Sequence, residues 1–62
     1  MDNAELKDAL LGGHLVTYNN IVYTVSAIIY RNNNGSVKVA AELLDKNNNC
    51  VVIADPKKVE VK

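Results

Sequence analysis

Residues 21–45 read IVYTVSAIIYRNNNGSVKVAAELLD, and this stretch decides the fold. Apolar and polar residues alternate on both sides of the asparagine-rich segment 32–35, and a period of two is typical of β-strands. Asparagine and glycine tolerate the backbone angles of tight turns, so the stretch predicts a hairpin. Its second strand is half exposed, because one face collects the larger apolar side chains: Val37, Val39, Ala41 and Leu43.

Two registers of this hairpin are open. A two-residue turn at Asn34-Gly35 sets Arg31 opposite Lys38, and like charges directly opposite each other are unfavourable. A four-residue loop sets Arg31 opposite Ser36 and avoids the repulsion. We therefore favour the longer loop. Both registers keep the same side chains on one face: Ile28, Tyr30, Val37 and Val39.

The strand before the turn is apolar on both faces over residues 27–30. Such a pattern indicates burial on two sides, a bend in the strand, or an interface. Ser26-Ala27 is the place where we expect a bend, because small residues permit one. By strict alternation Tyr30 has the opposite parity to Tyr23, and since it lies near a loop we expect it to be exposed.

A second hairpin is predicted around Asn19-Asn20. Asparagine can take the positive φ that a type I′ turn needs at both central positions. A two-residue turn here pairs Tyr18 with Ile21 and Val16 with Tyr23, and it places all four side chains on one face. We assign both tyrosines of this hairpin to the core.

The chain begins with a predicted helix over residues 1–12. Asp2 can cap it, Glu5 has the spacing of a capping box, and Gly12-Gly13 can end it. A helix this short is marginal alone, so it must pack on the sheet. The face that it presents carries Leu6, Ala9 and Leu10.

Beyond residue 44 the pattern of strand, asparagine turn and strand recurs. Residues 45–49 form the turn and residues 50–54 the next strand. Asp55-Pro56 then predicts a single helical turn, since aspartate caps helices and proline suits the first helical position. Val59–Val61 is a last short strand with alternating faces.

This order of elements resembles the SH3-like small barrels, including Sm-like proteins, in which a one-turn helix precedes the fifth strand. The resemblance implies a mainly β, small α+β fold. A short N-terminal helix and cap (1–12) precedes a five-stranded antiparallel SH3-like barrel or strongly bent sheet (14–62), all in one domain (1–62). Separately, the segments SAIIYR and AELLDKNNN look like those of short prophage proteins of Gram-positive bacteria, which implies a phage-type accessory protein without a known activity.

Composition limits the functional classes. Sixty-two residues with seven basic and seven acidic side chains have a formal net charge of zero, which argues against a partner held by phosphate neutralisation. A single cysteine and no signal peptide predict a reducing cytoplasm. No apolar run approaches the roughly 20 residues that span a bilayer, so we expect no membrane partner.

Two chemical sites can be considered. Residues 45–49 match the first half of a calcium loop, but Cys50 and Pro56 occupy the positions that need glycine and a bidentate glutamate. A nucleophilic Cys50 would need His14 as its base and an orienting partner, and we interpret Cys50 as a half-buried filler instead. We therefore expect no metal, cofactor, small-molecule ligand or enzymatic activity.

The remaining hypothesis is a non-catalytic protein-binding or assembly module. A chain this short buries only about 60% of its unfolded surface, so we predict a homodimer or docking on a protein partner. The expected interaction surface comprises Ile28, Tyr30, Arg31, Val37 and Lys38. The alternative is a small nucleic-acid-binding barrel that uses Tyr30, Arg31, Lys38, Lys57 and Lys58.

Overall fold

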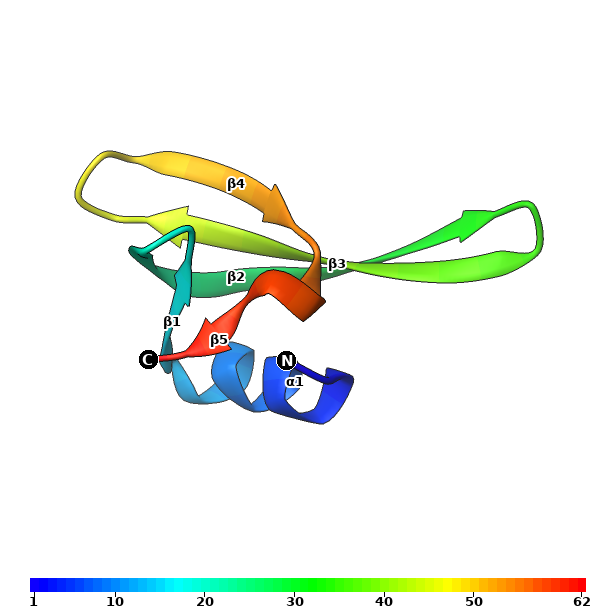
Figure 1. Ribbon diagram of the computed structural model, residues 1–62, viewed down its shortest axis with the longest axis horizontal. Coiled ribbons are helices and arrows are strands. Elements are labelled where there is room, and N and C mark those ends of the chain that lie inside the picture. The colour runs from blue at the N-terminus through cyan, green and yellow to red at the C-terminus, as the bar shows by residue number, and fades with distance from the viewer.

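One helix and five strands make up the fold, and the computed structural model describes all residues, 1–62 (Figure 1). In chain order the elements are α1 (Asn3–Gly12), β1 (Leu15–Tyr18), β2 (Ile21–Asn33), β3 (Ser36–Asp45), β4 (Cys50–Ala54), the 3₁₀ turn η1 (Pro56–Lys58) and β5 (Glu60–Val61). All neighbouring strands are antiparallel, in the order β4-β3-β2-β1-β5.

The predicted fold class is confirmed: the chain is mainly β, with one short N-terminal helix and a five-stranded antiparallel sheet. Of the two expected forms of the sheet, the closed barrel is not formed, because the sheet stays open with β4 and β5 as its edges. No helix is both long and apolar enough to cross a membrane.

The helix α1 begins and ends as predicted. The Asp2 carboxylate accepts a hydrogen bond from the Glu5 N–H at 2.8 Å, and the Glu5 carboxylate accepts one from the Asp2 N–H at 3.2 Å, which completes the capping box. Gly13 ends the helix in the left-handed conformation with φ +67°. Leu6 and Ala9 are buried against the sheet, whereas Leu10 is only half-buried.

The asparagine segments form turns. Asn19 and Asn20 both have positive φ, at +52° and +64°, and the turn pairs Tyr18 with Ile21 as predicted. Asn34 and Asn49 each have a φ of +52°. Such angles cost most side chains about 1–2 kcal/mol, and asparagine tolerates them best after glycine.

The expected four-residue loop between β2 and β3 is wrong. Asn33 pairs with Ser36, so Asn34 and Gly35 alone form the turn, and Arg31 faces Lys38. Asn34 and Gly35 both take the positive φ that a type I′ turn requires. The gain from this turn exceeds a repulsion of a few tenths of a kcal/mol between two exposed side chains.

The predicted bend at Ser26-Ala27 is confirmed as a β-bulge. Val25 pairs with Leu43 and Ala27 with Glu42, so Ser26 has no partner of its own in β3. The Ser26 hydroxyl donates instead to the Glu42 carboxylate at 2.9 Å.

The bulge reverses the alternation of β2. One extra residue moves Ile28 and Tyr30 to the face that carries Val25 and Tyr23, so the opposite parity expected for Tyr30 is wrong. We call this the inner face of the sheet, because α1 packs on it, and we call the opposite face the outer face.

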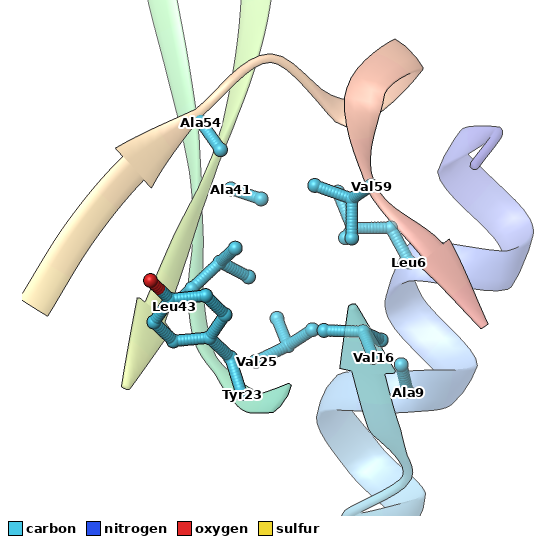
Figure 2. Close-up of a cluster of buried hydrophobic side chains, with 9 residues drawn as sticks. All are labelled: Leu6, Ala9, Val16, Tyr23, Val25, Ala41, Leu43, Ala54 and Val59. Carbon is cyan, nitrogen blue, oxygen red and sulfur yellow. The ribbon is translucent and has the colours of Figure 1, made fainter. Parts of the chain in front are cut away.

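The hydrophobic core lies between the inner face and α1. Figure 2 shows its side chains converging from the helix, from strands β1 to β4 and from the segment before β5. Tyr23 is buried, and half-buried Tyr18 packs beside it with ring centroids 6.4 Å apart, as predicted. The buried set is Leu6, Ala9, Val16, Tyr23, Val25, Ala41, Leu43, Ala54 and Val59.

The β2–β3 hairpin extends well beyond this core (Figure 1). β1 pairs only with residues 21–24 of β2, and β4 pairs only with residues 41–45 of β3. Residues 27–40 therefore form a two-stranded projection, which we call the arm. The arm contributes to a longest dimension of 37 Å, against 21 and 18 Å in the other directions.

Candidate interaction surfaces

The arm carries the whole predicted interaction surface. On its inner face Tyr30 and Val37 are 63% and 66% exposed, and Ile28 is half-buried near the core. On its outer face Arg31 and Lys38 are exposed and directly opposite each other. The sequence has no acidic residue between positions 27 and 41, so the arm is purely basic.

A groove of about 610 Å³ lies at the base of the arm, where β4 ends and β3 continues alone. Val37 and Val39 line it from the inner face of β3, and Lys38 lines it from the outer face. Ile53 and Ala54, at the end of β4, close one side. The groove therefore straddles the free edge of β3.

The backbone of this edge is available for hydrogen bonding. In an antiparallel pair the residues alternate between those that bond their partner and those whose N–H and C=O point away from it. Counted from the two-residue turn, the bonded pairs of β3 with β2 are those of Ser36, Lys38 and Ala40. The N–H and C=O groups of Val37 and Val39 therefore point into the groove.

The groove gathers three of the basic residues. Arg31, Lys38 and Lys57 all line it, together with one acid, Asp55. The Asp55 carboxylate accepts a hydrogen bond from the Lys57 N–H at 3.0 Å and thereby caps η1. Lys58, which sequence reasoning grouped with these cations, lines a different hollow beside Asn19 and Glu60.

The outer face of the sheet is a second candidate surface. Leu15, Thr24, Leu44 and Val51 are register partners in β1, β2, β3 and β4, so they form one row across four strands. Leu15 is 46% and Val51 57% exposed. Nearby apolar side chains on the same face are exposed as well: Val22 and Ile53.

Sequence reasoning missed this row. Leu44 breaks the alternation of its strand, and residues 50–54 form an unbroken apolar run. A strand that is apolar at every position has apolar side chains on both faces, and that signal could have revealed the outer row.

Residues 45–49, which match the first half of a calcium loop, form a turn. The Asp45 carboxylate, 8% exposed, accepts hydrogen bonds from the Asn47 N–H at 3.0 Å and the Asn48 side-chain amide at 2.9 Å. Asn49 takes the left-handed conformation before β4. The oxygens of Asp45 thus hold the loop itself. The structure has no group of three or more histidine, cysteine or acidic side chains placed to hold a metal ion.

His14 and Cys50 lie on separate parts of the sheet. His14 precedes β1 and Cys50 begins β4, with β2 and β3 between those strands. Cys50 is exposed, which contradicts its interpretation as a half-buried filler, and its thiol is 3.4 Å from the Asn48 carbonyl oxygen. The structure does not bring the two residues together.

Comparison with known proteins adds no relative. No protein-family model, no curated protein sequence and no solved structure matches the chain. The arm with its groove and the outer face of the sheet are therefore the features from which function can be inferred.

Proposed function

We propose that this chain is a non-catalytic protein-binding and assembly module that forms a homodimer through the outer face of its sheet. The observation that carries the proposal is the row of Leu15, Thr24, Leu44 and Val51 across four adjacent strands. Three of its four side chains are apolar, and no helix or strand of the chain covers them, since α1 packs on the inner face.

Layer packing gives the physical reason. A sheet with apolar side chains on a face is stabilised when that face is buried against another layer. Large exposed apolar patches on soluble proteins commonly mark interaction sites. A second copy offers the same row, so two sheets can pack face to face at the usual separation of about 10 Å.

The small size of the core supports self-association. Only 11 of the 62 residues are buried. A domain of about 60 residues is only marginally stable alone, and a disulfide, a metal or a partner commonly adds stability. The chain has one cysteine and therefore cannot form an internal disulfide. A second copy on the outer face would supply the missing apolar burial.

The oligomeric state tests this proposal. Sedimentation equilibrium from low micromolar to several hundred micromolar chain should show a concentration-dependent monomer–dimer equilibrium. Val51→Glu places a charge in the row and should shift the chain to monomer while it stays folded. Leu11→Glu is the matched control, because Leu11 is 74% exposed on α1 and lies outside the row. A wild-type monomer throughout, or equal effects of both variants, would overturn the proposal.

The cytoplasmic location and the prophage-type accessory role are part of the same proposal. A small assembly module without an evident catalytic site fits an accessory protein that acts by binding. The genes adjacent to its own provide the test: neighbours that encode capsid, replication or anti-defence proteins would support the role, and a metabolic operon would contradict it.

A second candidate function is binding of a nucleic acid through the groove. The observation in its favour is that Arg31, Lys38 and Lys57 line one groove. Binding through phosphates weakens steeply with salt. Retention of the wild-type chain on heparin at low salt, lost in Lys38→Glu, would support this function. Passage of the wild-type chain through the heparin column without retention would exclude it.

A further inference from the structure

We propose that the groove at the free edge of β3 binds an extended segment of a partner protein, in which acidic and apolar side chains alternate. The segment would add to the sheet as a strand in line with β4. The inference rests on the protein-binding part of the proposed function and is independent of the homodimer, which uses the outer row.

The groove has the position and length for an added strand. β4 pairs with β3 only as far as Ala54, which lies opposite Ala41. Residues 36–40 of β3 continue past this point with no partner on that side. Five residues of antiparallel strand span about 17 Å. The added segment would occupy the place that β4 leaves empty.

The backbone of β3 supplies the hydrogen bonds. The N–H and C=O groups of Val37 and Val39 point away from β2 and into the groove, as the register requires. Strand addition uses such main-chain groups for affinity and takes specificity from the alternating side chains. Val37 is 66% exposed, so a segment can reach this edge without displacing the core.

The side chains around the edge define the chemistry of the segment. Its residues on the outer face would meet Lys38 and Arg31, which have no acidic neighbour within residues 27–41. Its residues on the inner face would meet Val37 and Val39. Acidic side chains therefore suit one face of the segment and apolar side chains suit the other.

The chain has a segment of its own in which apolar and acidic residues alternate, but this segment does not fill the groove. Val59-Glu60-Val61 alternates as required, but Glu60 and Val61 pair with Thr17 and Val16 of β1. Val59 is 1% exposed within the core. Removing this segment from its place would open the core, so a segment of another protein is the occupant that we propose.

A pair of short peptides tests the inference on the full chain. The probe is Glu-Val-Glu-Val-Glu-amide with a fluorescent label on its N-terminus, and the control probe replaces all three glutamates with lysine. Titration of the ¹⁵N-labelled chain with the acidic probe should shift the amide signals of residues 36–40, 53–55 and 57. The basic probe should leave these signals in place.

Two variants of the chain separate the charge from the backbone. Lys38→Glu should lower the affinity for the acidic probe at least tenfold. Lys46→Glu, at an exposed position in the β3–β4 loop, should change this affinity by less than twofold. Val37→Pro removes an N–H that does not bond β2, so the chain should stay folded and lose the probe. A thermal melt of each variant verifies folding.

Each remaining outcome decides against the inference. Equal binding of both probes, or shifts confined to the outer row, would overturn it. Displacement of the probe by a single-stranded oligonucleotide that binds more tightly would assign the groove to nucleic acid. Loss of dimer in Lys38→Glu, with Val51→Glu unaffected, would assign the groove to a second copy and would also refute the proposed dimer face.

Discussion

Arg31 lies directly opposite Lys38 in the ladder between β2 and β3. The pair costs stability, and neither residue has an acidic neighbour on the arm to offset the repulsion. Natural sequences tend to break such local rules at functional sites. The like-charge pair therefore supports the proposal that the arm serves in recognition.

Lys38→Glu should separate stability from binding. The change converts the repulsive cross-strand pair into an attractive one, so the free energy of unfolding should rise by a few tenths of a kcal/mol. Urea denaturation measures this rise. The same variant should lose the acidic peptide, whereas Lys46→Glu should alter neither property. A destabilised Lys38→Glu chain would contradict the observed register.

Asn20→Ala should destabilise the first hairpin. Asn20 has φ +64°, and a residue with a non-polar Cβ is strained there by about 1 kcal/mol relative to asparagine. Asn20→Gly should be nearly neutral, because glycine adopts positive φ freely. Asn33→Ala, in the extended part of β2, is the control and should change little. Equal losses at Asn20 and Asn33 would refute the turn role.

Asp45→Ala should loosen the loop between β3 and β4. It removes the acceptor of two hydrogen bonds at a position that is 8% exposed, and we expect a loss of about 1–2 kcal/mol in the free energy of unfolding. Asp8→Ala, on the exposed side of α1, is the control. Isothermal titration calorimetry with Ca²⁺ tests the opposite interpretation. Tight Ca²⁺ binding by the wild-type chain that is lost in Asp45→Ala would show that the loop is a cation site.

Ile29→Asp and Leu43→Asp should behave differently. Leu43 is fully buried, so a carboxylate there should unfold the chain. Ile29 is half-buried and pairs with Ala40 on the outer face, so its variant should fold. Circular dichroism separates the two results. An unfolded Ile29→Asp chain would place Ile29 in the core and remove it from the outer face.

Local signals predicted much of the fold correctly. The capping box at Asp2 and Glu5, the turn at Asn19-Asn20 and the bend at Ser26 each follow from a few neighbouring residues. These features depend on backbone angles and spacing that the sequence states directly. They can therefore be located from the sequence alone.

The errors arose where distant or competing effects decide. The register at Arg31 depends on a balance between turn geometry and charge repulsion, and turn geometry prevails. The face of Tyr30 depends on the bulge at Ser26, because one added residue reverses the face of every later side chain in β2. The outer row forms because four strands lie side by side, and the apolar run of residues 50–54 indicates only that one of these strands is apolar on both faces.

The most direct test of the proposed assembly is an isotope-filtered NOE experiment on a mixture of labelled and unlabelled chain at high concentration. The account predicts intermolecular NOEs among the methyl groups of Leu15, Leu44 and Val51. It is contradicted if a dimer forms whose intermolecular NOEs involve only other surfaces, or if the chain gives sharp monomer signals and no intermolecular NOE.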